Sequence, residues 1–156
     1  MNNLECLFRA MQRLFAREPC YCDSGCCISH WRSRVREAYQ HRPTKPVCAI
    51  SGWIWLDVTA STSIHRRFQQ QHGLRLSLVI ARRVILDDSG TLWLGGWLRS
   101  TFLKAFHRNH IFETNQLCVL LVGTGGRLTI TFDEMVQLFP ASVPRAIVQS
   151  RSKHLN

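Results

Sequence analysis

Acidic residues are scarce in this sequence. Ten Asp and Glu stand against 20 Lys and Arg in 156 residues, which gives a formal net charge of +10 and a pI of about 10.0. A charge balance of this sign favours anionic partners, meaning nucleic acid or an acidic membrane surface. With so few carboxylates and no paired catalytic pattern among them, the chain is predicted to be non-enzymatic.

Lysine is scarcer than arginine. Lys45, Lys104 and Lys153 are the three lysines, so the other 17 basic residues are arginines. A guanidinium can bind a phosphate group with two parallel hydrogen bonds, so this bias suits phosphate contacts. A GC-rich or overlapping reading frame of a compact viral genome produces the same bias.

Long apolar runs and a secretory signal are also lacking. No apolar run approaches the ~18 residues of a membrane span, and Glu5, Arg9 and Arg13 interrupt the first apolar residues. The sequence therefore predicts a protein that is not secreted and that lies in the cytoplasm of a host cell at a membrane surface, or in the nucleus. Its seven cysteines, an odd number, are then expected to be reduced thiols.

The first motif that is present is an apolar stripe with helical spacing within residues 3–17. It predicts an amphipathic helix that Pro19 stops. Two interpretations stay open: the stripe packs on the protein's own core, or it lies in a membrane interface with arginines toward lipid phosphates. The predicted membrane-binding residues are Leu4, Leu7, Phe8, Met11, Leu14 and Phe15.

A dense group of cysteines follows this helix. Zinc ligation, S-acylation beside the amphipathic helix, and unliganded thiols all remain open for it. The spacing is C-x-C followed by an adjacent C-C, which suits a single zinc tetrahedron less well than two C-x2-4-C pairs. The candidate acylation or metal-binding residues are Cys20, Cys22, Cys26, Cys27 and His30.

Basic and aromatic residues are interleaved over residues 31–45. This pattern can hold phosphates while aromatic rings stack on bases, or it can be an ordinary surface helix with Trp31, Val35 and Tyr39 on one face. Two Arg-Arg pairs in the body of the chain are further candidates. The predicted anion- or nucleic-acid-binding residues are Arg32, Arg34, Arg36, Arg42, Arg66, Arg67, Arg82 and Arg83.

The body of the chain alternates like β-sheet. In the stretch 53–59, Trp53, Trp55 and Asp57 are predicted to face one side of a strand and the residues between them the other. The Gly-rich stretch 123–126 lacks the Gly-Lys-Ser/Thr of a phosphate loop and is predicted as a hairpin turn. The other predicted elements are strands at 47–50 and 74–80, a hairpin at 84–94, a helix at 97–107, a hairpin at 117–132, and a short helix that Asp133 caps and Pro140 ends.

These elements predict an α+β fold with a twisted, mainly antiparallel sheet and one or two packed helices. The predicted organisation is an amphipathic helix with a Cys- and Arg-rich arm over residues 1–45, a β-rich core domain over 46–140, and a flexible basic tail over 141–156.

Two stretches resemble the matrix proteins of rhabdovirus-type (mononegaviral) viruses. Residues 52–64, GWIWLDVTASTSI, look like their first core strand and its exit, and residues 126–134, GRLTITFDE, are similar to a late strand. Together they cover about a seventh of the chain. The chain departs from the family in lacking a proline-rich budding motif and a lysine-rich arm. The resemblance implies a small viral structural protein that touches membrane and nucleoprotein.

The leading functional prediction is a small, basic, non-enzymatic viral-type protein that works as a matrix-like peripheral membrane adaptor. The alternative is a zinc-stabilised RNA-binding accessory protein, for example a silencing suppressor. No cofactor is predicted apart from the zinc of this alternative. The expected partners are an anionic membrane surface, RNA or nucleoprotein, host proteins, and further copies of the chain.

Overall fold

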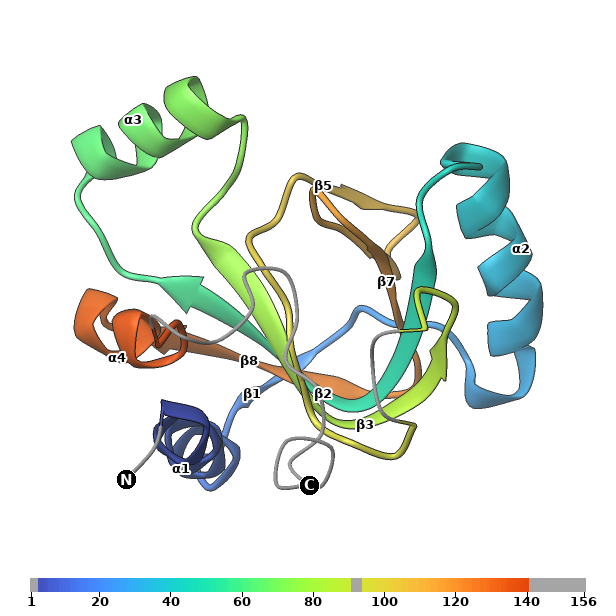
Figure 1. Cartoon of the computed structure of the whole chain (residues 1–156), viewed down its shortest axis with the longest axis horizontal. Coiled ribbons are helices and arrows are strands. Elements are labelled where there is room, and N and C mark those ends of the chain that lie inside the picture. Colours follow the sequence, from blue (N-terminus) through green and yellow to red (C-terminus); the bar gives the residue numbers. More distant parts are fainter. Residues whose placement is uncertain (1–2, 91–93, 141–156) are drawn as a thin grey trace.

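The computed structural model describes residues 3–90 and 94–140, and this part of the chain forms one α+β domain. Within it, four α-helices surround a curled, mainly antiparallel sheet, which confirms the predicted fold class (Figure 1). The helices are α1 (Asn3–Phe15), α2 (Trp31–His41), α3 (Thr62–His72) and α4 (Phe132–Gln137), and a short 3-10 helix η1 (Ile28–His30) precedes α2.

The sheet is organised around β2, a strand of 12 residues. One path through the sheet runs β1-β8-β2-β7-β6-β5, while β3 pairs with the other edge of β2 and also with β4. The strands are β1 (Cys20–Cys22), β2 (Val47–Val58), β3 (Ser77–Asp87), β4 (Leu98–Arg99), β5 (Ala105–His107), β6 (Ile111–Glu113), β7 (Cys118–Leu121) and β8 (Gly125–Ile130).

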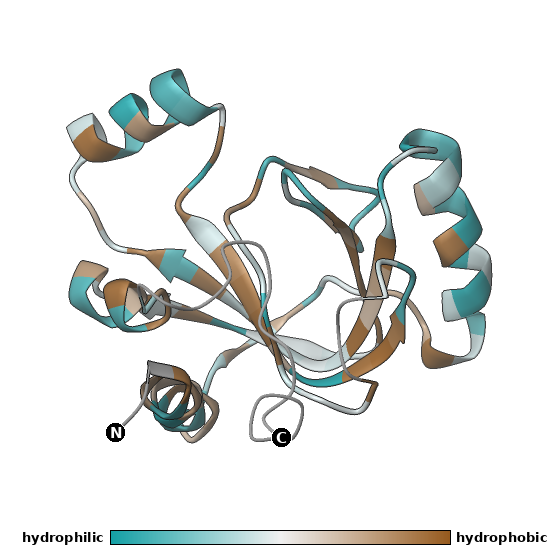
Figure 2. Ribbon diagram, viewed as in Figure 1, coloured by the Kyte–Doolittle hydropathy of each residue, from teal (hydrophilic) through white to brown (hydrophobic). Residues whose placement is uncertain are grey.

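β2 continues through a point where the sequence predicted a break. The Ser51-Gly52 step lies inside the strand, with Gly52 at φ 61° and a register shift against β3 between Ala49 and Ile50. Side chains then alternate as expected. Trp53 and Trp55 pack on one face of the sheet, and Ile54, Leu56 and Val58 pack on the other. Figure 2 shows hydrophobic residues along β2 and β3.

The predicted hairpin at 117–132 is wrong, because β7 and β8 both run parallel to β2. β7 pairs Val47 with Cys118, and β8 pairs Ile54 with Gly126, so the two strands follow one another along the same edge with one extra residue between them. All four residues of β7 are buried, as is typical of a strand covered on both faces. Gly123, at φ 75°, lies at the bend between the two strands instead of in a hairpin turn.

The apolar stripe of α1 lies in the protein core. Leu7, Met11 and Leu14 are at most 3% exposed and pack with residues of β2, β3 and α4. Phe8 and Phe15 contact the ring of Trp97 edge-on, with ring centroids 5.6 and 5.3 Å apart. The interpretation of the stripe as a membrane anchor is therefore corrected: five of its six side chains are buried on the sheet and have no surface with which to enter a bilayer, and Leu4 packs partly buried against the same core.

The predicted arm is part of the same fold as the body. β1 pairs antiparallel with β8, and α2 packs through Trp31, Val35, Ala38 and Tyr39 on the sheet near β7. The predicted helical face of residues 31–45 is thus a packing face. The predicted flexible tail, 141–156, lies outside the described residues, as do positions 91–93 of the predicted hairpin at 84–94.

Three further local predictions need correction. Residues 97–107 form β4, β5 and a connecting segment that bridges to Arg75 through Leu103, because β3 pairs with β4 and β6 pairs with β5. Thr131, not Asp133, caps α4, in a capping box with Glu134. Helix α3 was missed, although Ser61 caps its first turn and Gly73 ends it at φ 66°.

None of the helices in the described ranges is long and apolar enough to cross a membrane.

If the α1 stripe is core, truncating it must destabilise the protein. We expect Met11→Ala to lower the free energy of unfolding by ~2–5 kcal/mol, because Met11 is fully buried. Gln12→Ala, at the exposed neighbouring position, should change it little. Urea unfolding of both variants measures the difference. A Met11→Ala protein that unfolds like the wild type but no longer floats with anionic liposomes would restore the anchor interpretation.

Candidate functional site: a basic pocket between helix α3 and the sheet

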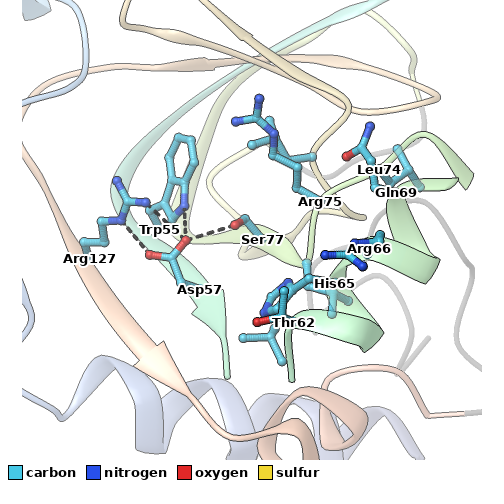
Figure 3. Close-up of a pocket in the computed structure, with 13 residues that line it drawn as sticks. Trp55, Asp57, Thr62, His65, Arg66, Gln69, Leu74, Arg75, Ser77 and Arg127 are labelled. Atoms are coloured by element: carbon cyan, nitrogen blue, oxygen red, sulfur yellow. Dashed lines mark hydrogen bonds and ion pairs between the residues drawn. The ribbon is translucent and has the colours of Figure 1, made fainter. Parts of the chain in front are cut away.

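A pocket of about 540 Å³ lies where α3 stands off from the sheet, between this helix, the end of β2 and β8 (Figure 3). Its wall on the sheet side includes Trp55, Asp57 and Ser77, and β8 contributes Arg127. These four residues meet because β2 pairs Asp57 with Ser77 on one edge and Trp55 with Arg127 on the other.

Asp57 is saturated by hydrogen-bond donors. The indole Nε1 of Trp55 donates to Oδ1 at 3.0 Å and the Ser77 hydroxyl at 2.9 Å. Arg127 donates Nε to Oδ2 at 2.6 Å and Nη2 to Oδ1 at 3.2 Å, while its guanidinium lies 4.9 Å from the Trp55 ring centroid. The hydrogen bond to Asp57 raises the pKa of Arg127. The single carboxylate of the pocket is thus neutralised within the protein.

Two further guanidiniums line the pocket without such a partner. Arg66 comes from α3 and Arg75 from the segment that leads into β3, where its backbone bridges to Leu103. Both side chains are exposed, and the structure gives neither of them an ion pair with any described residue. Because the charges of Arg127 and Asp57 cancel, the pocket carries two uncompensated positive charges, those of Arg66 and Arg75.

Helix geometry aims α3 at the pocket. Thr62, His65, Arg66 and Gln69 follow one another at helical spacing and line the pocket together. Figure 3 shows Arg66 and His65 on one side of the opening and Asp57, Trp55 and Arg127 on the other. Arg67 lies on a different face of α3 and lines a separate cavity. The Arg66-Arg67 pair of the sequence is therefore divided between two surfaces.

The predicted basic strip on α2 does not form one binding surface. Arg34 is paired with Glu37 and Arg42 with Glu113, and Arg32 lies over the Trp31 ring at 4.7 Å. Of this strip, Arg36 is exposed and has no ion pair with a described residue. On β3, Arg83 is exposed, while Arg82 donates a hydrogen bond to the Phe15 carbonyl and packs over its ring.

Sequence reasoning missed Arg75 and Arg127 as residues of the pocket. Each is a single arginine among alternating strand residues, and neither stands in a basic cluster of the sequence. The alternation of β2 places Asp57 on the same face as Trp55, but the partner of this carboxylate depends on which strand pairs with β2. The acid-free stretch 59–73, with Ser61 and Gly73 as possible helix caps, was a signal for α3 and Arg66, but no local signal indicated Arg75 or Arg127.

The cysteine cluster does not gather around a common point. Cys22 packs with the tryptophans of β2, Cys26 packs under α2, and Cys20 and Cys27 are exposed. Within the described ranges, no group of three potential ligands includes a cysteine. The described residues therefore give zinc no common site among these thiols, because Cys22 and Cys26 are buried in separate core clusters while Cys20 and Cys27 are exposed. Unliganded thiols and S-acylation of the exposed ones remain compatible with this placement.

One exposed thiol has a polarised surrounding. Cys27 Sγ lies 3.0 Å from the Ser29 hydroxyl, which lies 3.3 Å from Nδ1 of His30. The hydrogen bonds from Ser29, with a contribution from His30, lower the pKa of Cys27 to about 7. Burial instead raises the pKa of Cys26 and of Cys118, and Cys118 is fully buried.

A second polar cluster joins the end of α2 to the sheet. Glu113 is fully buried, and its carboxylate accepts hydrogen bonds from Lys45 Nζ at 2.5 Å, His107 Nε2 at 2.8 Å and Arg42 Nε at 3.2 Å. The His41 ring lies 4.0 Å from that of His107, so that His41, His107 and Glu113 could offer ligands to one cation. Lys45 and Arg42 already supply two charges to this carboxylate, which opposes a further divalent charge there.

One comparison with known proteins assigns the chain to a family. Residues 23–137 match the model of a protein family described as a domain of unknown function (DUF6957). The chain belongs to this family. No curated protein and no solved structure matches it. The match begins after α1 and β1 and includes α2, all the other strands of the sheet, α3 and α4, so the pocket lies within the family domain.

The buried carboxylate makes stability depend on pH in a defined window. Burial alone would raise the pKa of Glu113, but the hydrogen bonds from Lys45 and His107, with the charge of Arg42, outweigh it and lower the pKa to about 2. Because the folded pKa lies below the unfolded one, this stabilisation is present above about pH 4.5 and is lost as the pH falls toward 2. We expect Glu113→Gln to flatten the pH dependence of the melting temperature in this window.

Glu5→Gln provides the matched control, because Glu5 is another carboxylate on a different part of the fold. If the Glu113→Gln variant kept the wild-type slope between pH 4.5 and 2, the ion cluster would contribute nothing to stability.

Proposed function

We propose that this protein is a non-enzymatic RNA-binding protein that holds the phosphates of a single strand in the pocket beside α3. The observation that carries the proposal is the excess of guanidinium groups there: Arg66 and Arg75 face an opening whose own carboxylate is already bound by Arg127. Guanidiniums without an ion pair favour phosphate oxygens, which accept paired hydrogen bonds from them.

A polymer fits the charge distribution better than a small phosphate compound. The whole chain carries a net charge of +10. A net charge of this size attracts a polyanion from a distance more strongly than it attracts a small phosphate compound. The opening between a helix and a sheet edge has the size of a ligand pocket and suits a splayed single strand, which can enter a concave site more readily than a duplex.

The chemistry of the pocket supports binding without catalysis. Asp57 accepts bonds from Trp55, Ser77 and Arg127, so its carboxylate has little capacity left to act as a general base. Its aromatic residue, Trp55, is 5% exposed and covered by Arg127, so recognition would depend on phosphate contacts more than on base stacking.

The matrix-like adaptor function loses the element that was to anchor it, because the stripe of α1 is buried. An anionic membrane could still supply phosphates to the same pocket. The experiment therefore includes vesicles as a separate arm.

We expect the double variant Arg66→Ala/Arg75→Ala to bind a labelled oligouridylate of about 12 nucleotides more weakly than the wild type. The logarithm of the binding constant falls linearly with the logarithm of the salt concentration, and loss of two phosphate contacts to a single strand should make this slope shallower by about 1.4. Fluorescence anisotropy over a range of NaCl concentrations measures this slope. Arg36→Ala/Arg83→Ala removes the same charge from exposed positions outside the pocket and should leave the slope close to that of the wild type.

Equal effects of the two double variants would mean that binding follows net charge and not the pocket. Binding of phosphatidylserine vesicles with the same dependence on Arg66 and Arg75, together with no binding of the oligouridylate, would assign the pocket to a lipid headgroup and overturn the proposal.

A further inference from the structure

An apolar groove lies between α3 and α4, on the side of α3 that faces away from the basic pocket. It encloses about 470 Å³. Its inner side is aromatic: Phe102 packs edge-on against Phe68 and stacks on Phe139, with ring centroids 5.1 Å apart in both cases. Figure 1 shows α3 and α4 on the same side of the sheet, with α1 next to α4.

The rim of the groove exposes large hydrophobic side chains. Ile64 on α3 is 42% exposed, and Phe132 and Val136 on α4 are 46% and 51% exposed. They are half of the six large hydrophobic residues that are exposed within the described ranges. Single exposed hydrophobic residues are ordinary, but three around one groove are typical of an interaction surface.

The groove is surrounded by positive charge. Arg67 lines it, and a neighbouring cavity of about 370 Å³, which shares Val136, is lined by Arg9 and Arg13. The residues that line these two cavities include no Asp or Glu. Glu134 of α4 is held by Arg17 and by the capping box, so its charge is compensated, and Asp133 is the other acid of this helix.

The floor of the groove is held in place from below. Arg99 is fully buried, donates a hydrogen bond from Nη1 to the Leu138 carbonyl at 2.7 Å, and lies 4.2 Å from the Phe139 ring centroid. The end of α4 and the aromatic floor are therefore fixed in the free protein, so a partner would find a preformed surface.

We propose that this groove docks an acidic amphipathic helix of a partner protein. A helix with apolar side chains at i, i+3 or i+4 and i+7 can cover Ile64, Phe132 and Val136, and this is a common way for a helix to occupy a groove. Acidic side chains next to that stripe would meet Arg67, Arg9 and Arg13, and the net charge of +10 favours the same sign of partner over long range. The surface is separate from the basic pocket, since Arg66 and Arg67 point to different cavities.

The probe is a labelled synthetic helix of about 15 residues with leucines at helical spacing and glutamates between them. Its counterpart has lysines in place of the glutamates. We expect the acidic peptide to bind in fluorescence anisotropy and the basic one not to bind. Phe132→Ser/Val136→Ser should weaken binding of the acidic peptide by about tenfold or more, while Tyr21→Ser/Ile28→Ser, which removes exposed hydrophobic residues elsewhere, should not.

Arg67→Glu is the second test, because this exposed residue can change without disturbing the core. It should weaken binding of the acidic peptide and leave oligouridylate binding nearly unchanged. The groove proposal fails if the acidic peptide binds the Phe132/Val136 and Tyr21/Ile28 variants equally, or if both peptides bind alike. It also fails if sedimentation shows a wild-type dimer that the Phe132/Val136 variant abolishes, since the occupant would then be a second copy of the chain.

Discussion

The whole domain depends on the way both edges of β2 are paired. Along one edge runs β3; along the other, β7 and β8 follow one another in the same direction. The continuation from β7 to β8 requires glycine, because a Cβ atom on Gly125 would lie 2.2 Å from the ring of Trp53. The indole of Trp53 instead lies against bare backbone and donates to the Gly123 carbonyl at 3.2 Å. Trp53 thus packs at the start of β8, where only glycine leaves room for its ring.

Several of the few acidic residues are bonded at junctions between elements, where they stabilise the fold, and other arginines are left exposed. Several carboxylates each fix a junction: Glu113 ties α2 to the sheet, Glu134 ties α4 to Arg17 of the α1 end, and Asp57 ties β8 to β2. A carboxylate that is bonded in this way neutralises one or two cations at a structural position. The remaining cations, such as those of α3, are then left toward solvent, where a polyanion can reach them.

Helix α3 gives the domain two separate surfaces. The chain leaves the end of β2, forms this helix without burying any of its residues fully, and returns to the sheet at Leu74. One face of α3 borders a polar, positively charged pocket, and the other borders an aromatic groove. In Figure 2 the helix is mainly hydrophilic with hydrophobic residues at intervals, as expected for an element between two such surfaces. The two proposed binding sites therefore lie on separate faces of α3.

The amino-acid sequence alone determined the elements with a clean period: the helix of α1, the alternation of Trp53 and Trp55 along β2, and the packing face of α2. Periodicity is local and states which side of an element is apolar, but it does not state what covers that side. Only the tertiary structure decided that α1 covers the sheet and not a bilayer, and that residues 97–107 contain strands. It also decided that the chain keeps its direction through the glycines at 123–126, so that β7 and β8 both pair parallel with β2. The basic pocket has the same origin, because Arg66, Arg75 and Arg127 come from three separate segments, which the pairing of β2 with β3 and with β8 brings together.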